Sequence, residues 1–285
     1  MTLQGRNAAV GERLVAEDLQ LTASERRVAR ALLRDYPAAG LNTVASLAKA
    51  SSVSGPTVMR FVKSLGFDSF RDFQEALRSE LGPREASALS QSARNHRGNE
   101  RQTLIDGVNE SVTRTPDSEL RTAVRLLADS GRQVVAVGGD YSQIAARQLV
   151  LQLAPVRPRV RTLPSETVLI AAEIADISKG DVWCIFDVRR YRPRTYRIAQ
   201  AAAERGAKIV LFTDRWLSPI AGFATVVFTA QVESAGPTDT ATPLLAVTEV
   251  LCEQVERSLG KQGVARLEHV DPLREAIEPS QLRDD

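Results

Sequence analysis

The sequence predicts an all-α helix-turn-helix domain over residues 1–81, followed by a three-layer α/β domain over residues 102–260 with a five-stranded parallel sheet. Three observations predict these classes. Between residues 21 and 81 the apolar residues recur at helical spacing. From residue 133 onward, short β-branched runs alternate with helical patterns, which is typical of a parallel sheet covered by helices. Residues 82–101 are rich in Ser, Arg, Asn and Gly with little apolar pattern, so they are predicted to form a linker.

Two short helices around a tight turn are predicted within residues 42–67. Thr43 is placed to cap the first helix, and Ser54 to cap the second, with Pro56 in its first turn. Gly66 ends the second helix. This arrangement indicates a helix-turn-helix.

The second of these helices has two chemically different faces. Val58, Phe61, Val62 and Leu65 recur at i, i+3, i+4 and i+7 and form a buried back. The opposite face is expected to be polar and basic, which suits a helix that enters a DNA major groove. The residues expected to contact DNA are Ser54, Thr57, Arg60, Lys63 and Ser64 on this helix and Thr43 before it.

A helix is predicted on each side of the helix-turn-helix. The first runs from Leu21 to Tyr36 and turns Val28, Ala31 and Leu32 inward. The second is capped by Ser69 and runs from Phe70 to Leu81, with Phe70, Phe73 and Leu77 as its apolar stripe. Residues 1–20 are expected to form a frayed or short helical arm.

The composition is that of an ordinary globular protein. Of 285 residues, 43% are hydrophobic and 25% charged, and the formal net charge is only +2. Any DNA affinity must therefore come from the local placement of charge. No run of 18 apolar residues exists, and charged residues interrupt the first 20. We therefore expect a cytoplasmic protein with no membrane partner.

The cysteine and histidine content argues against a metal site or a cofactor. Cys184 and Cys252 are far apart in apolar context, so buried thiols are favoured over a disulfide or a metal pair. His96 and His269 lie near no carboxylate or serine cluster, which argues against histidine-based catalysis. The expectation is no catalytic residue, no metal and no cofactor.

The elements of the second domain follow from its alternating pattern. Helices are expected at 102–112 and from 117 or 118 to about 130 before the first strand. Residues 261–285 are expected to be a loosely held, partly helical tail. The expected strands are 134–137, 159–162, 182–186, 208–212 and 225–228, and the later helices are 142–154, 165–175, 195–205, 218–222 and 240–259.

Residues 21–81 resemble the N-terminal domain of RpiR-family transcriptional regulators. The resemblance rests on the run VS-x-x-TV-x-RF…LGF-x-x-F, all of which is present between Val53 and Phe70. Ser52 stands where the family usually has glycine. A turn there requires a left-handed residue, which serine adopts at a cost of about 1 kcal/mol. The alternative is a purely structural three-helix bundle.

Residues 118–259 resemble a sugar isomerase (SIS) domain, the usual partner of that N-terminal domain. GDVWCIF…ERGAKIVLFTDRWLSPIAGFATVVF carries the resemblance. It implies a phosphosugar held by two loops, G-x-G-x-S at a helix N-terminus and S-x-S-G-x-T. In the first loop here, Gly138 and Ser142 match, but Asp140 replaces the second glycine. In the second loop, 187–195, only Thr195 remains, as an expected helix cap.

The second loop instead carries four arginines and a tyrosine, so two interpretations stay open. Arg189 or Arg190 binds a different anion, with Asp140 and Asp187 reading hydroxyls or an amine. Alternatively, the arginines pair with acids of the same fold and hold an empty loop closed. The residues expected to bind the effector are Ser142, Asp140, Asp187, Arg189, Arg190, Thr195 and Glu166.

Glu166 and the segment before the last helix have simpler explanations too. Glu166 is a first-turn acid that would meet the helix dipole. Ser234, Thr238 and Asp239 are explained as capping and turn residues, or as residues that line the pocket of a dimer mate.

The resemblance implies a DNA-binding regulator with an effector-sensing domain. We expect a homodimer or homotetramer on a pseudo-palindromic double-stranded DNA operator, and an effector such as a sugar phosphate or a sugar acid. The helix 240–259 has more apolar residues than one side of a sheet needs, so part of it is expected to meet a partner chain. The alternatives are a phosphosugar isomerase and a regulator whose SIS domain senses nothing.

Overall fold

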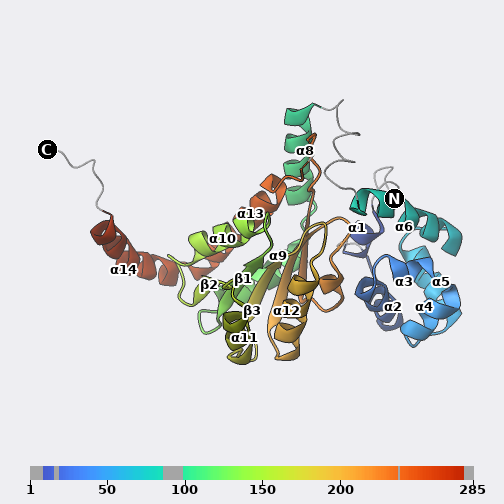
Figure 1. Cartoon of the computed structure of the whole chain (residues 1–285), viewed down its shortest axis with the longest axis horizontal. Coiled ribbons are helices and arrows are strands. Elements are labelled where there is room, and N and C mark those ends of the chain that lie inside the picture. The colour runs from blue at the N-terminus through green and yellow to red at the C-terminus, as the bar shows by residue number, and fades with distance from the viewer. Residues whose placement is uncertain (1–8, 16–18, 86–98, 237, 279–285) are drawn as a thin grey trace.

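The computed structural model describes residues 9–15, 19–85, 99–236 and 238–278. A helical domain at the N-terminal end lies beside a larger α/β domain (Figure 1). Both predicted fold classes are confirmed, with the helix-turn-helix in the first domain and a five-stranded parallel sheet in the second.

The helical domain packs its helices around one apolar core. Thr43 caps its helix by accepting a hydrogen bond from the Ser46 amide at 3.1 Å. Ser52 adopts the left-handed conformation expected at the turn, with φ of 52°, and Gly66 has φ of 84° beyond the end of the second helix. The helices are α1 (Val10–Leu14), α2 (Ala23–Arg34), α3 (Ala38–Leu41), α4 (Val44–Ala50), α5 (Gly55–Ser64) and α6 (Phe70–Glu85).

Two features of this domain differ from the sequence prediction. α6 continues to Glu85, so the first residues of the predicted linker are helical, and residues 86–98 lie outside the described part of the chain. The short helix α3 is not expected from the sequence, because Pro37 and Gly40 indicate a break. Within the predicted N-terminal arm, the described residues form the short helix α1, whose Val10 is fully buried in the core of the domain.

The sheet of the second domain has the strand order β2-β1-β3-β4-β5, and every neighbouring pair is parallel. The strands match the predicted positions to within two residues at each end. They are β1 (Val134–Gly138), β2 (Val160–Thr162), β3 (Val182–Phe186), β4 (Lys208–Asp214) and β5 (Val226–Ala230).

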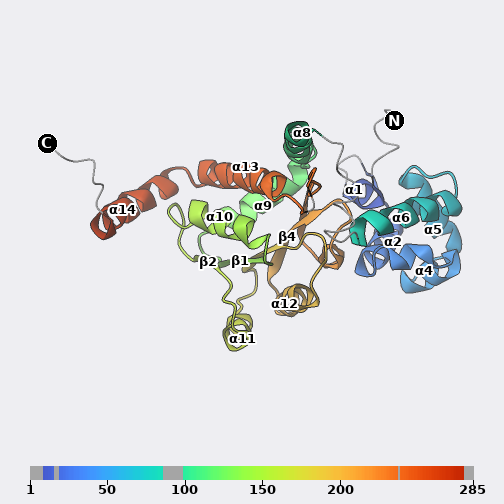
Figure 2. The same cartoon turned by 45° about the horizontal axis from the view of Figure 1, so that its top comes forward.

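Helices cover both faces of the sheet. Side chains alternate along each strand, so Val134 and Ala136 join one apolar core while Val135 and Val137 join the other. One face is covered by α9 (Asp117–Ala128), α10 (Gln143–Leu153) and α13 (Thr242–Leu259), with α8 (Glu100–Thr113) packed against α13. The other face holds α12 (Pro193–Glu204) and the 3₁₀ helix η2 (Pro219–Gly222), with α11 (Thr167–Ala175) beside α12 (Figure 2).

The C-terminal region agrees in part with its prediction. Leu244, Val247 and Leu251 of α13 are buried within their own chain, where α8, α9 and α10 cover the helix, so a contact of α13 with a partner chain stays a prediction. The segment expected to be a partly helical tail contains one continuous helix, α14 (Lys261–Ile277), which points away from the body of the domain (Figure 1).

Cys184 and Cys252 are both free and buried, as predicted. Burial raises the pKa of the Cys184 thiol to about 12, so this group stays protonated and packs in the core as an apolar side chain.

Among the helices of the described residues, none is both long enough and apolar enough to cross a membrane.

Candidate functional site

The front of α5 is polar, basic and exposed. Ser54, Arg60, Lys63 and Ser64 are all exposed, while Val58, Phe61 and Val62 behind them are fully buried. α5 lies on the side of the helical domain that faces away from the α/β domain in both views (Figures 1 and 2). This surface is therefore open to a long partner such as a DNA duplex.

Thr57 does not lie on this exposed front, contrary to the sequence prediction. It precedes Phe61 by four residues, about one helical turn, and so it shares the buried side of α5, with 5% of its surface exposed. Its hydroxyl oxygen accepts a hydrogen bond from Arg60 Nη2 at 3.1 Å and lies 3.0 Å from Ser54 Oγ. Thr57 therefore positions Arg60 instead of facing a partner itself.

The two loops predicted to hold the effector meet at the carboxyl edge of the sheet. They follow β1 and β3, which are neighbours in the centre of the sheet. The chain continues to opposite sides of the sheet at this point, and parallel α/β domains bind ligands at such switch points. Gly138 makes the tight turn there, because a Cβ would lie 2.6 Å from the Gln143 backbone nitrogen. A cavity of about 190 Å³ opens between the loops.

Ser142 and Thr195 line this cavity, but both are buried. Ser142 Oγ accepts from the Gly139 amide at 2.9 Å and donates to the Phe186 carbonyl at 2.7 Å, which ties the first loop to β3. Thr195 is the third residue of α12 and not its cap, since the N-cap is Arg192.

Asp187 is buried at the base of the cavity. Its carboxylate accepts a hydrogen bond from Ser218 Oγ at 2.5 Å. Burial, together with the nearby Asp214, raises the pKa of Asp187 to about 7. Burial also raises the pKa of Asp214, which is buried at the end of β4. The cavity therefore has at its base a carboxyl group that changes charge near neutral pH.

Arg189 is also buried, and its partners belong to the same chain. Its Nε lies 3.0 Å from Asp239 Oδ1, and its guanidinium stacks over the Trp216 ring at 4.7 Å. Its backbone amide donates to Asp214. Arg189 and Arg190 both have left-handed backbones, with φ of 37° and 38°, which non-glycine residues adopt at a cost.

A second ion pair spans the cavity mouth. Arg192 donates through both terminal nitrogens to the two carboxylate oxygens of Asp140. Both residues also line a neighbouring cavity of about 290 Å³, so the pair lies between two hollows. Arg189 and Arg192 thus pair with acids of their own fold, as the second interpretation expected, whereas Arg190 is exposed on the cavity wall.

Glu166 is the predicted effector residue that the structure does not bring to this site. It is exposed at the start of α11 and lines neither cavity. Sequence reasoning also missed several lining residues, because they come from separate segments. They are Tyr141 and Val188 on the two loops and Thr240 and Leu244 near the start of α13. Asp239, considered for the pocket of a dimer mate, lines the cavity of its own chain.

Comparison with known families assigns both domains. Residues 9–84 match the family model described as "Helix-turn-helix domain, rpiR family". Residues 126–254 match that of the SIS domain. The chain therefore joins an rpiR-type helix-turn-helix domain to a SIS domain. Its two-domain order, a DNA-binding type of domain before a SIS domain, is the one that the sequence resemblance implied.

Two curated proteins illustrate the relatives of this chain. An uncharacterized HTH-type transcriptional regulator, CPE0189 of Clostridium perfringens, is 24% identical over 230 residues, which span 73% of this chain and 77% of the relative. The bifunctional protein glk of Burkholderia orbicola is 27% identical over 78% of this chain. The match covers 35% of glk, so this chain spans about a third of that protein.

Two solved structures share the fold. The sugar isomerase domain of an RpiR transcription factor from Sphaerobacter thermophilus matches 61% of this chain and 96% of its own, with a TM-score of 0.56 and 23% identity. The NanR protein of Vibrio vulnificus, solved with ManNAc-6P, matches 95% of this chain and 100% of its own, with a TM-score of 0.52 and 19% identity.

The raised pKa of Asp187 predicts a pH-dependent stability. A carboxyl whose pKa is near 7 when folded and about 3.9 when unfolded contributes stability that is complete below about pH 4 and is lost as the pH rises through 7. Between pH 5 and pH 8 the unfolding free energy of the wild type should therefore fall by about 2–3 kcal/mol more than that of Asp187→Asn. Urea denaturation at a series of pH values measures this difference.

Asp140→Asn is the matched control, because Asp140 is an exposed carboxylate on the neighbouring loop. Its pH curve should run parallel to that of the wild type. If the wild type and Asp187→Asn also run parallel, Asp187 does not titrate in the folded protein as described.

Proposed function

We propose that this chain is a DNA-binding transcriptional regulator that reads a pseudo-palindromic operator as a homodimer or homotetramer, and that its SIS domain binds a small anionic, carbohydrate-derived effector. The observation that carries the proposal is the exposed basic front of α5, joined in one chain to a SIS domain with a cavity at its switch point. Such a regulator acts in the cytoplasm, where its operator lies.

Affinity for DNA would come from lysine and arginine contacts to phosphates and from helix N-termini. Specificity would come from Arg60 and Lys63 on the front of α5, at the edges of the bases. Thr43 and Ser54 cap the two helices of the motif and are exposed, so they are placed for phosphate contacts. Thr57 contributes through its hydrogen bond to Arg60.

The cavity supports an anionic effector that differs from a simple phosphosugar. NanR was solved with ManNAc-6P, a sugar phosphate. In this chain the second loop lacks the serines that the resemblance implies, and its Arg190 and Arg192 line the cavity instead. Arginine binds carboxylate and phosphate through paired N–H groups. A sugar acid therefore fits this cavity better than a ligand that depends on serine hydroxyls.

Simple assays distinguish the proposed regulator from two alternatives, a phosphosugar isomerase and a regulator whose SIS domain binds no effector. A phosphosugar isomerase requires a general base, and histidine often fills this role. Among the described residues that line the two cavities there is no histidine, which supports the regulator. Turnover of phosphosugars by the full chain would favour the enzyme. A SIS domain that senses nothing would show no thermal shift with any sugar phosphate, sugar acid or amino sugar.

Arg60→Ala tests the reading helix. If Arg60 makes a bidentate contact with a base, the variant should lose about 1–3 kcal/mol of operator binding per helix-turn-helix. Fluorescence anisotropy with an operator fragment measures the loss. Arg71→Ala is the control, since Arg71 is an exposed arginine on α6. Equal affinities of the wild type and Arg60→Ala would remove Arg60 from the contacts.

Arg190→Ala tests the effector site. Phosphate, sulfate or a sugar acid should raise the melting temperature, and an anion at 100 times its Kd should stabilise by about 2.7 kcal/mol. Arg190→Ala should abolish the shift, whereas Arg197→Ala, an exposed arginine of α12 outside the cavity, should keep it. A sugar phosphate bound at Ser142 and Thr195 without any arginine contact would contradict this site.

Assembly should use apolar side chains that the fold leaves exposed on α10 or on α11, which lie on opposite sides of the sheet. Ile144, Leu151, Val168 and Leu169 are 57%, 58%, 74% and 48% exposed. A dimer would present two copies of α5 to half-sites about 34 Å apart or a multiple of that distance. Light scattering should give a dimer or a larger assembly, and Val168→Glu should shift it towards the monomer. A wild-type monomer at micromolar concentration would contradict binding to a two-fold operator.

A further inference from the structure

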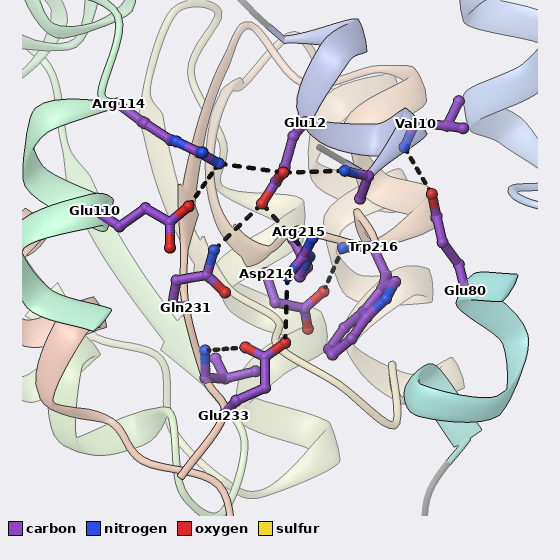
Figure 3. Close-up of polar contacts among 12 residues, drawn as sticks. Val10, Glu12, Glu80, Glu110, Arg114, Asp214, Arg215, Trp216, Gln231 and Glu233 are labelled. Carbon is purple, nitrogen blue, oxygen red and sulfur yellow. Dashed lines mark hydrogen bonds and ion pairs between the residues drawn. The ribbon is translucent and has the colours of Figure 1, made fainter. Parts of the chain in front are cut away.

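The helix α1 is fastened to the helical domain. Val10 is fully buried in the core of that domain, and its amide donates to Glu80 Oε1 at 2.6 Å (Figure 3). Arg13 donates to the Leu65 carbonyl at 2.9 Å, next to the end of α5, and stacks over the Phe67 ring at 4.4 Å. A displacement of α1 is therefore transmitted to the domain that carries α5.

The same helix is fastened to the SIS domain through Glu12, whose side chain is 10% exposed. Its carboxylate lies 3.3 Å from Arg114 Nη1 and 3.5 Å from Arg215 Nε, and accepts from Gln231 Nε2 at 3.3 Å (Figure 3). The backbones also approach closely, since a Cβ on Gly11 would lie 2.4 Å from the Arg215 carbonyl oxygen. A carboxylate shared by two arginines of another domain fixes both the distance and the direction of docking.

A second contact runs beside the first. Leu33 of α2 packs on the apolar core between the sheet and α12. A Cβ on Gly222 of η2 would lie 3.3 Å from the Arg34 backbone nitrogen, so these two elements also meet closely. These contacts hold the helical domain in place, while Glu12 supplies the charged part of the docking.

The residues Asp214–Ser218, here called the junction segment, touch the cavity on one side and α1 on the other. On the cavity side, Asp214 accepts from the Arg189 amide, from Tyr191 Oη at 2.5 Å and from the Trp216 amide at 3.0 Å. Ser218 donates to Asp187. On the other side, Arg215 pairs with Glu12.

This arrangement leaves the cavity loop little independent freedom. An anion that binds Arg190 or Arg192 acts directly on the loop 187–192, which carries both residues. The backbone of that loop is bonded to Asp214, and the Arg189 guanidinium lies over Trp216. A shift of the loop therefore changes the junction segment, and with it the position of Arg215 relative to Glu12.

We propose that the junction segment couples the effector cavity to the docking of the helix-turn-helix domain, and that the pairing of Glu12 with Arg215 and Arg114 is the latch that sets this docking. The coupling to an effector rests on the proposed function, but the latch does not. In a dimer, the latch would determine how far apart and at what angle the two α5 helices are held.

Hydrogen–deuterium exchange of the full chain, without DNA or effector, tests the latch. Each variant changes a residue at one end of the proposed connection, and the exchange rate is measured at the other end. Glu12→Gln should speed exchange at residues 187–192 by about fivefold. Arg189→Ala should speed exchange at residues 10–15 by a similar factor. Because both act on one connection, the double variant should exchange no faster than the faster single variant at either segment.

Two variants serve as matched controls. Glu110→Gln removes a carboxylate that pairs with the same Arg114 at 2.7 Å but lies on the same helix, α8. Arg192→Ala removes an arginine of the same cavity loop, whose ion pair is with Asp140 and not with the junction segment. Both should leave exchange at residues 10–15 within about twofold of the wild type. Arg189→Lys replaces Arg189→Ala if circular dichroism shows that the alanine variant is misfolded.

The outcomes separate the latch from the effector. Unchanged exchange at 187–192 in Glu12→Gln, or at 10–15 in Arg189→Ala, would overturn the coupling. Inorganic phosphate is then added as a probe and should change exchange at residues 10–15 in the wild type but not in Arg189→Ala. If the variants behave as expected and phosphate has no effect, the anionic effector of the proposed function is contradicted while the latch stands.

Discussion

The buried carboxylate of Asp214 is the group on which the geometry of the site depends. A charged group removed from water costs several kcal/mol unless its hydrogen-bonding capacity is filled. Asp214 meets this requirement with the amides of Arg189 and Trp216 and with the hydroxyl of Tyr191. Because these donors come from the cavity loop and from the junction segment, the two cannot be positioned independently. The end of β4 thus organises both the cavity and the contact with the helical domain.

The cavity lies where the resemblance to a SIS domain implies a ligand site, but different side chains line it. Where the resemblance implies serine hydroxyls and a second glycine, this chain places an ion pair between Arg192 and Asp140. Their side chains are 54% and 69% exposed, and an ion pair so exposed contributes only about 0–1 kcal/mol. A ligand anion can therefore displace Asp140 from Arg192 at little cost. The ion pair of Arg189 and Asp239 is less exposed, with side chains 4% and 25% exposed, and it holds the shape of the loop.

The sequence predicts well the features that depend on neighbours along the chain. The turn at Ser52, the cap at Thr43 and all five strands follow from local spacing, because caps and periodicity are local properties. Contacts between distant segments could not be predicted. The pairing of Glu12 with Arg215 joins residues about 200 positions apart, and nothing in the surroundings of either residue indicates it. The burial of Thr57 could have been predicted, since it lies one helical turn before Phe61.

The docking of the two domains leaves α5 exposed. α1 and α2 face the SIS domain, whereas α5 lies on the far side of its domain in both views (Figures 1 and 2). Docking therefore leaves the exposed front of α5 uncovered. A two-fold assembly reads DNA only when its two helices match half-sites spaced by whole helical turns, about 34 Å or a multiple. A change of a few ångströms or degrees at a short charged contact is enlarged across the width of the helical domain. In the proposed two-fold regulator, a small latch at Glu12 would be sufficient to move the two α5 helices between spacings that match an operator and spacings that do not.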